Sequence, residues 1–315
     1  MKQLIVVALL LACVIPATAQ GSKFNVNCDK GDKINKLLST IAKAGAVSPV
    51  TINVSGNCKE SVLIQNFDRL TLITKTGAVI IGTSKNVNAA VTITQSSYVT
   101  LQGFVIQSGS DGVDCLQNSI CNLTGLTVEN ATGAGAAFGR SQGVLTANVF
   151  QNNGFRGLNV VNGSRVVVLG GTSQGNAADG IGVVSGSNLT MEGATIQNNA
   201  ANGIIVALGS SLRIFDDVIS GNGGNGILLA SQSNGSLEQS VTGNVVTGNG
   251  LNGVKVRDVS FARFLDTNNV SGNLAQPDVT CQPQFPATRG AGTAGGTTDC
   301  VEPTESKADR DSEAR

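Results

Sequence analysis

Two consecutive stretches of the chain, IGVVSGSNLTMEGATIQNNAANG (residues 181–203) and IIVALGSSLRIFDDVISGNGGNG (residues 204–226), share one length and one pattern. Each holds three short runs in which apolar residues alternate with polar or small ones, and Asn, Gly and Ser fill the positions between the runs. Alternation of period two is typical of short β-strands. A unit of this size cannot bury its apolar side chains alone, so the pattern predicts that successive units stack on one another.

The same register extends in both directions. A glycine closes each unit at intervals of 22 to 27 residues, at Gly112, Gly135, Gly157, Gly180, Gly203, Gly226 and Gly253. Four residues before five of these glycines stands an asparagine, at Asn153, Asn176, Asn199, Asn222 and Asn249. A further column is apolar, at Val128, Phe150, Ile196, Ile219, Val246 and Val270. We expect the asparagines to pass amide hydrogen bonds from coil to coil, and the glycines to serve turns that need positive φ.

The repeats between about residue 91 and residue 273 resemble the right-handed parallel β-helix proteins of the pectin-lyase-like superfamily. The upstream segment VTINVSGNCKESVLIQNFDRLTLI (residues 50–73) looks like the irregular first coils of such proteins. The resemblance implies an all-β fold, a right-handed parallel β-helix with three-stranded coils of 22–23 residues. It does not imply one activity, because the superfamily includes lyases, hydrolases, epimerases, esterases, phage spikes and adhesins.

The regions outside the repeats suggest two caps. Residues 20–49 form a predicted N-terminal capping segment, in which Asp32 precedes a short helix with Ile34, Leu37, Leu38 and Ile41 on one face. The β-helix is expected over residues 50–273, followed by an irregular, disulfide-closed cap over 274–300. The charged residues 301–315 are expected to be a disordered tail.

Residues 1–19 have the features of a secretory signal peptide, with Lys2, an apolar run from Leu4 to Ile15 and an Ala-x-Ala cleavage site. We therefore expect export to the periplasm, the cell exterior or the cell surface. A weaker alternative is lipidation at Cys13, since LLAC loosely resembles a lipobox. No later segment is apolar and long enough to predict a membrane span.

Six cysteines remain after the signal, and an even number in an exported chain suggests disulfides. Six cysteines allow about fifteen pairings. Proximity in the sequence favours Cys28–Cys58, Cys115–Cys121 and Cys281–Cys300.

Composition excludes several functions. The chain of 315 residues carries 21 basic and 21 acidic residues, and this balance argues against nucleic-acid binding. It has no His and no Trp, which removes His-based catalytic triads, imidazole zinc sites and the His-containing signatures of the superfamily's best-known enzymes. The single tyrosine, Tyr98, makes a poor aromatic platform for stacking sugars.

Two clusters of charged residues are candidates for chemistry. The candidate catalytic cluster, with an arginine as base and carboxylates for a calcium ion, comprises Asp111, Asp114, Arg140 and Arg156. The candidate metal cluster, with Arg213 nearby, comprises Glu192, Asp216, Asp217 and Glu238. Turn caps and surface ion pairs are the ordinary alternative for both clusters.

The outward positions beside the first strand of each coil are small or apolar, and the expected strip comprises Val184, Ile205, Ala207, Leu228 and Ala230. Such a strip is usually covered by the chain's own C-terminal segment, by another subunit or by a partner. The leading expectation is a secreted or surface protein that binds a glycan or another surface component without catalysis. The alternatives are a calcium-dependent polysaccharide lyase-like enzyme and a self-associating rod.

Overall fold

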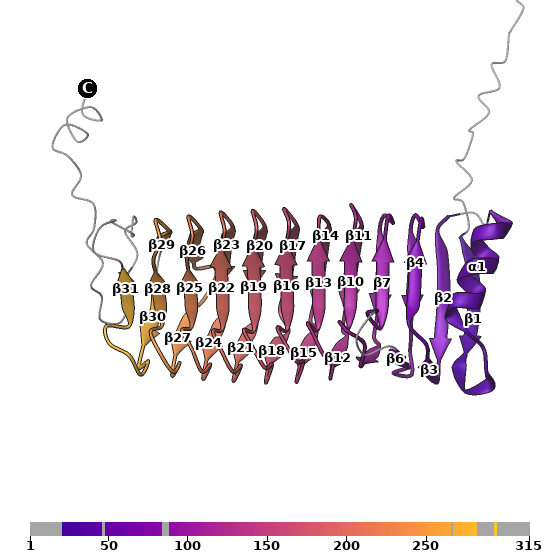
Figure 1. The fold of residues 1–315 in the computed structure, drawn as a ribbon, viewed down its shortest axis with the longest axis horizontal. Helices are drawn as coiled ribbons and strands as arrows, with labels where there is room; N and C mark the ends of the chain where they lie inside the picture. The colour runs from indigo at the N-terminus through magenta and orange to yellow at the C-terminus, as the bar shows by residue number, and fades with distance from the viewer. Residues whose placement is uncertain (1–20, 46–47, 84–87, 266, 282–292, 295–315) are drawn as a thin grey trace, which may run out of the picture.

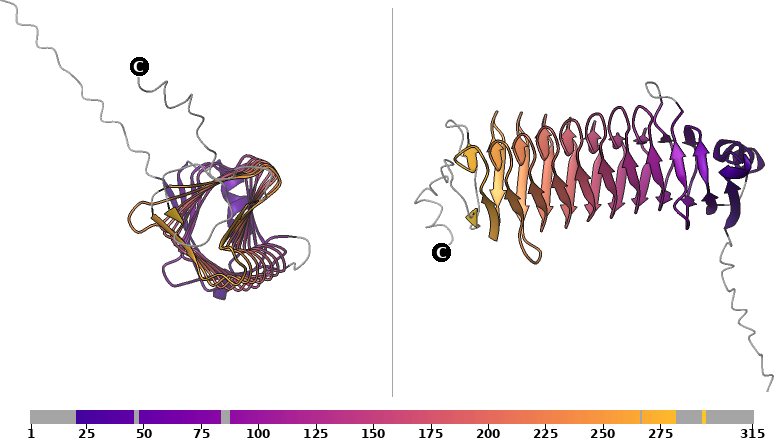
Figure 2. Two further views of the ribbon diagram at one scale, coloured as in Figure 1. Left: turned by 90° about the vertical axis from the view of Figure 1, so that its left-hand side faces the viewer. Right: turned by 90° about the horizontal axis from the view of Figure 1, so that it is seen from below.

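A computed structural model describes residues 21–45, 48–83, 88–265, 267–281 and 293–294. The described chain winds into a straight rod of stacked coils, with helix α1 (Ile34–Ala44) at its N-terminal end (Figure 1). Viewed along the rod, successive coils superimpose (Figure 2). The predicted signal peptide and charged tail lie outside the described residues.

Three parallel sheets run along the rod. Sheet A has eleven strands, in order β1 (Ser22–Asn27), β2 (Val50–Ser55), β5 (Leu70–Ile73), β8 (Val99–Gln102), β11 (Ile120–Thr124), β14 (Gln142–Thr146), β17 (Arg165–Leu169), β20 (Asn188–Glu192), β23 (Ser211–Phe215), β26 (Asn234–Glu238) and β29 (Phe261–Phe264). Sheet B also has eleven, β3 (Asn57–Lys59), β6 (Val79–Ile81), β9 (Val105–Gln107), β12 (Thr127–Glu129), β15 (Val149–Gln151), β18 (Thr172–Gln174), β21 (Thr195–Gln197), β24 (Val218–Ser220), β27 (Val245–Thr247), β30 (Thr267–Ser271) and β32 (Thr293–Ala294).

Sheet C has ten strands and faces the viewer in Figure 1, with β4 (Val62–Gln65), β7 (Val91–Thr94), β10 (Val113–Leu116), β13 (Ala136–Gly139), β16 (Leu158–Val161), β19 (Ile181–Val184), β22 (Ile204–Ala207), β25 (Ile227–Leu229), β28 (Val254–Val256) and β31 (Val279–Cys281). Each strand pairs with the equivalent strand one coil later, so Ile181 lies beside Ile204 and then Ile227. The predicted repeat register is thus confirmed.

The predicted asparagine column forms a buried ladder. The Nδ2 of Asn176 donates to the Oδ1 of Asn199 at 2.9 Å, and the Nδ2 of Asn199 donates to the Oδ1 of Asn222 at 2.9 Å. Each Oδ1 also accepts a backbone N–H from the previous coil, as Asn199 does from Asn176 at 3.1 Å. The ladder continues beyond the predicted members through Asn273, whose Nδ2 donates to Asp278 at 3.1 Å. A final acceptor needs no amide, which is why a carboxylate suffices at that end.

The column of closing glycines has a different cause from the one expected. None of these glycines has positive φ. A Cβ on Gly180 would instead lie 2.8 Å from the carbonyl oxygen of Gly203 and 2.7 Å from the Nδ2 of Asn199. The glycine is required because the next coil's backbone and the asparagine ladder occupy the space of a side chain.

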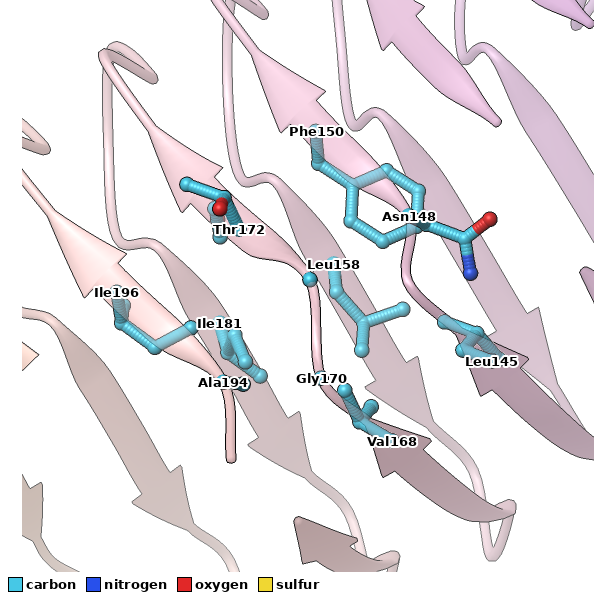
Figure 3. Close-up of a pocket in the computed structure, with 12 residues that line it drawn as sticks. Leu145, Asn148, Phe150, Leu158, Val168, Gly170, Thr172, Ile181, Ala194 and Ile196 are labelled. Atoms are coloured by element: carbon cyan, nitrogen blue, oxygen red, sulfur yellow. The ribbon is translucent and has the colours of Figure 1, made fainter. Parts of the chain in front are cut away.

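The third apolar column is interrupted at Ser173, which lies in register between Phe150 and Ile196. A small cavity of ≈ 10 Å³ lies at this point, lined mostly by apolar side chains that include Phe150, Leu158 and Ile196 (Figure 3). The space is about that of one water molecule. The Ser173 hydroxyl donates to the carbonyl of Gly180 at 2.8 Å.

We expect Ser173→Val to stabilise the fold by about 1 kcal/mol, because it adds apolar volume beside a void and restores the column. The Gly180 carbonyl would keep its bond from the Leu158 N–H. Thermal unfolding of the variant measures the effect, with Thr195→Val, a half-buried position of neighbouring strand β21, as control. A lower melting temperature for Ser173→Val would show that the hydroxyl contributes more than the filled space.

The N-terminal helix is confirmed, with Ile34, Leu38 and Ile41 buried. Its predicted cap is wrong: the side chain of Asp32 accepts from the Asn27 N–H at 3.0 Å instead. The helix N-terminus is capped by Glu60, whose carboxylate accepts from the N–H groups of Ile34 at 2.8 Å and Asn35 at 3.1 Å. A carboxylate from the first coil is favourable there because it meets free N–H donors and the positive end of the helix dipole.

Two of the predicted disulfides are confirmed, Cys28–Cys58 beside the N-terminal cap and Cys115–Cys121 inside the rod. Cys281 is also disulfide-bonded. Its expected partner, Cys300, lies outside the described residues.

Candidate functional site

The outer face of sheet C carries part of the candidate catalytic cluster. Outward side chains of neighbouring strands form a single row along the rod, at Asp114, Ala137, Asn159, Gly182, Ile205, Leu228 and Lys255. The rise is about 4.8 Å per coil. The row is polar towards the N-terminal end, small in the middle, apolar over two coils and cationic at Lys255.

Asp111 and Asp114 lie together at the polar end of the row. Burial, together with the charge of Asp111 and a hydrogen bond to it, raises the pKa of Asp114 to about 7. The Oδ1 of Asp114 is buried without a hydrogen-bond partner, while the Oδ1 of Asp111 accepts from the Ala134 N–H. Of these two carboxyls, Asp114 is therefore the one whose protonated form is favoured up to near neutral pH.

Arg156 lies two coils further on, in the register of Asp111, but it does not pair with that carboxylate. Its Nε donates to Asp179 of the next coil at 3.0 Å, and its Nη1 donates to Asn159 at 2.9 Å. Its guanidinium carbon lies 4.7 Å from the centre of the Phe155 ring. The guanidinium also lies over Gly182, where a Cβ would approach it to 2.5 Å. Arg156 is thus fixed flat on sheet C by neighbours on three sides.

Arg140 lies away from these groups, in the turn that follows β13, with a φ of 50°. Its exposed side chain makes no ion pair or hydrogen bond with any residue that the structure describes. The candidate catalytic cluster is therefore divided into three parts: the carboxyl pair, the fixed Arg156 and the free Arg140.

The candidate metal cluster is engaged in other interactions. Arg213 forms two hydrogen bonds of 2.6 Å with Glu238, and its guanidinium carbon lies 4.7 Å from the ring centre of Phe215. The bonds from Arg213 hold the pKa of Glu238 below its usual value. Glu192 lies exposed at the end of β20.

Asp216 anchors the loop that makes one repeat longer than the others. Its carboxylate accepts four backbone N–H groups, from Ser240 at 3.1 Å, Val241 at 2.6 Å, Thr242 at 3.1 Å and Gly243 at 2.7 Å. Desolvation opposes ionisation, but these four donors together lower the pKa of Asp216. The residue is a structural anion within its own loop.

Asp217 is fully buried. It belongs to a second hydrogen-bond ladder, in the turns that connect sheet A to sheet B. Its Oδ1 accepts from the Ala194 N–H at 2.6 Å, and its own N–H donates to Asn244 at 3.0 Å. Burial raises its pKa to about 7, although the N–H groups of Ala194 and Phe215 act in the opposite direction. The equivalent position one coil later is Asn244, so a neutral amide fits this site.

Stability should fall with pH because of Asp217. The pKa of Asp217 is raised from 3.8 to about 7 in the folded state. The contribution of Asp217 to the free energy of unfolding is therefore fully present below the unfolded-state pKa, and it is lost as the pH rises through the folded-state pKa. The loss should be about 2–4 kcal/mol, since one pKa unit corresponds to about 1.4 kcal/mol. Asp217→Asn should flatten this dependence in denaturant titrations between pH 4 and pH 8, whereas the exposed Asp68→Asn should not. An unchanged slope in Asp217→Asn would assign the pH dependence to other groups, such as Asp114.

No group of three or more Cys, Asp or Glu side chains among the described residues is arranged to hold a metal ion. The four carboxylates of the candidate metal cluster do not fit calcium as they stand. Three of them already bind protein N–H groups or Arg213, which leaves few oxygens for a cation that needs six or more.

The apolar strip lies on sheet C, and its members Ile205 and Leu228 belong to the same row as Asp114 and Asn159. Leu228 and Ala230 are buried, while Val184, Ile205 and Ala207 are half-buried. Association of two copies through this strip stays a prediction.

A network in the turns before sheet C was not expected from the sequence. Asp179 accepts from Arg156 and from both the backbone and the side chain of Asn202. Asn225 continues this network on Asn202. The sequence contains a pattern that could have predicted this network. The position directly before a closing glycine is polar in three successive coils, at Asp179, Asn202 and Asn225.

A family model described as right handed beta helix region matches residues 89–246. The chain belongs to this right-handed β-helix family. Comparison with curated protein sequences gives no match.

Solved structures with the same fold act on polysaccharides, according to their names. The A-module of mannuronan C-5 epimerase AlgE4 from Azotobacter vinelandii is similar with a TM-score of 0.63 and 14% identity, over 89% of this chain and 98% of that one. An alginate lyase from Paenibacillus sp. is similar with a TM-score of 0.58 and 15% identity, over 86% and 99% of the two chains. A mutant of the periplasmic alginate epimerase AlgG is similar with a TM-score of 0.54 and 14% identity, over 88% of this chain and 84% of that one. These identities establish the shared fold.

The described residues contain no helix long and apolar enough to cross a membrane. The disulfides are compatible with an exported protein. The signal peptide itself stays a prediction.

Proposed function

We propose that this protein is an exported β-helix rod that binds an acidic polysaccharide along the outer face of sheet C without cleaving it. The supporting observation is the arrangement across three coils, where the small side chain of Ala137 lies between Asp114 on one side and Asn159 with Arg156 on the other. The two polar sides are about 10 Å apart, from twice the rise of one coil. A sugar ring over Ala137 would meet hydrogen-bonding groups at both ends.

The chemistry of the two sides suits an acidic sugar. Arg156 keeps its Nη2 free of hydrogen bonds to the described residues, and a fixed guanidinium favours a planar carboxylate. Asp114 with its pKa near 7 is able to donate a hydrogen bond to a sugar hydroxyl when protonated. Similar folds in mannuronan and alginate enzymes are consistent with a polymer of this class.

Binding is favoured over catalysis because Arg156 is held by Asp179. An arginine in a buried ion pair is a poor proton acceptor. Arg140, the other cation of the candidate catalytic cluster, lies in the turn at the end of the strands.

Binding is tested by affinity electrophoresis in gels containing polygalacturonate, alginate or a neutral glucan. We expect retardation by an acidic polymer and a loss of at least about tenfold in affinity for Arg156→Ala, because an Arg–carboxylate contact contributes about 1.5–3 kcal/mol. The matched control is Arg213→Ala, which removes an arginine that also pairs with a carboxylate and lies over a Phe ring, but on sheet A. Equal retardation of both variants and the unaltered protein would contradict the proposed site.

The second candidate function is that of a lyase or epimerase, and one observation favours it. A carboxyl with a pKa near 7, as at Asp114, is matched to proton abstraction at neutral pH. An enzyme of this kind would release unsaturated, ultraviolet-absorbing ends or exchange a sugar C–H with solvent deuterium. Asp114→Asn should then abolish the reaction while retaining retardation in the gel.

A further inference from the structure

An open depression lies at the turns that connect sheet C to sheet A. It is lined by residues of three consecutive coils, has a volume of ≈ 490 Å³, and comprises Gln95, Ser97, Gln117, Asn118 and Arg140. Gln95 follows β7, Gln117 and Asn118 follow β10, and Arg140 follows β13. None of Asp111, Asp114 and Arg156 lines it.

The depression offers hydrogen-bond donors and almost no free acceptors on its long side chains. The Oε1 of Gln117 already accepts from the Thr94 hydroxyl at 2.9 Å, and the Oε1 of Gln95 accepts from the Nε2 of Gln65 at 3.0 Å. The Nε2 groups of both glutamines make no hydrogen bond to a described residue. With the unpaired guanidinium of Arg140 they form a cationic set of N–H donors, which favours ligand oxygens that carry negative charge.

The backbone beneath the depression is held in place. The Cys115–Cys121 disulfide closes the turn that carries Gln117 and Asn118. Below the turns runs a ladder of buried serines, in which the Ser96 N–H donates to the Ser119 hydroxyl at 3.2 Å, and the Ser119 N–H donates to Ser141 at 3.2 Å. A backbone held in this way loses little conformational entropy when a ligand binds to the side chains that it carries.

Tyr98 stands beside the depression. It follows the lining residue Ser97, is 56% exposed, and has a φ of 56°. An exposed phenol ring provides a flat apolar surface with a polar tip, which suits one face of a sugar ring. The chain has one Tyr and no Trp, so its intrinsic fluorescence above the phenylalanine band comes from this position alone.

We propose that this depression is a second binding site, separate from the face of sheet C, for a carbohydrate that carries carboxylate or sulfate groups. Arg140 and the amides of Gln95 and Gln117 bind the charged oxygens, and Tyr98 packs against the sugar ring. The proposal does not depend on polymer binding at Arg156, because the two sets of residues are disjoint.

Tyrosine fluorescence of the full-length exported protein tests the proposal directly. It is titrated with oligogalacturonate, a heparin-derived oligosaccharide, a cello-oligosaccharide and inorganic sulfate. We expect a saturable change with one or both charged oligosaccharides. A change with oligogalacturonate shows that carboxylates suffice, and a change with the heparin-derived oligosaccharide alone, which carries both groups, assigns sulfate as the ligand group. Arg140→Asn should weaken binding at least about tenfold, the loss expected for a charge-assisted contact. Asn suits the left-handed backbone here, and Asn162 already occupies the equivalent position one coil later with a φ of 57°.

The matched control is Arg263→Ala, which removes an exposed arginine from β29, far along the rod, and should bind as the unaltered protein does. Three results would overturn the proposal: no saturable change with either charged oligosaccharide, equal binding by Arg140→Asn, or equal affinity for the cello-oligosaccharide. Sulfate that binds as tightly as the oligosaccharides would overturn the carbohydrate part. Arg156→Ala should leave the Tyr98 signal unchanged, so failure at either site is distinguishable from failure at the other.

Discussion

Replacing Asn199 by alanine is expected to lower the free energy of unfolding by about 3 kcal/mol or more. The side chain is buried and makes five hydrogen bonds that alanine cannot replace. It accepts from the N–H and the Nδ2 of Asn176, and it donates to Asn222, to the Ser173 carbonyl and to the Gln197 carbonyl. The substitution leaves the Asn176 N–H buried without an acceptor, and such a group costs about 1–3 kcal/mol. An empty space in place of the amide adds to the loss.

Chemical denaturation followed by circular dichroism measures this effect. The control is Asn188→Ala, an exposed asparagine at the start of β20, which should change stability by less than about 0.5 kcal/mol. If the two variants were equally stable, the amide ladder would be a by-product of the coil geometry and would contribute nothing to its stability.

Gly180→Ala is the second substitution with a large expected effect, a loss of about 3 kcal/mol or failure to fold. The added methyl would lie 2.8 Å from the Gly203 carbonyl and 2.7 Å from the Nδ2 of Asn199, and it would also clash with the Ile196 side chain. Two of these neighbours belong to backbone or to the buried ladder, so the coil itself would have to shift.

Gly139→Ala is the matched control, since its new methyl would meet only the Leu116 and Val161 side chains, at 3.1 and 3.9 Å. Melting temperatures of the two variants compare the sites under one backbone change. If Gly139→Ala lowered the melting temperature as much as Gly180→Ala, glycine would be needed at these positions for its backbone flexibility and not for the space that it leaves.

The fold was predictable because a solenoid repeats its packing at fixed intervals. The apolar alternation and the column of Asn199 identified strands, turns and register from the sequence alone. The physical role of Gly180 was not predictable, because the obstruction comes from the next coil. The cap at Glu60 was missed for a similar reason, since the helix that it serves begins 26 residues earlier in the chain.

The candidate site was only partly predictable. The sequence placed Asp111 and Arg156 in one column, which the register bears out, but the direction of a long side chain depends on competing partners. Arg156 has Asp179 in the next coil and a small residue, Gly182, beneath it, so it extends away from Asp111. Asp216 and Asp217 are neighbours in the candidate metal cluster, yet one holds an exposed loop and the other a buried ladder.

The most direct test of the account is isothermal titration of the purified protein with polygalacturonate and alginate oligomers, with the same samples then scanned for unsaturated ends. We predict saturable binding of an acidic oligomer, weakened at least about tenfold by Arg156→Ala, with no ultraviolet absorbance after prolonged incubation with or without calcium. Cleavage of the oligomer, or affinity that does not change in Arg156→Ala, would contradict the proposal of a non-catalytic binding face on sheet C.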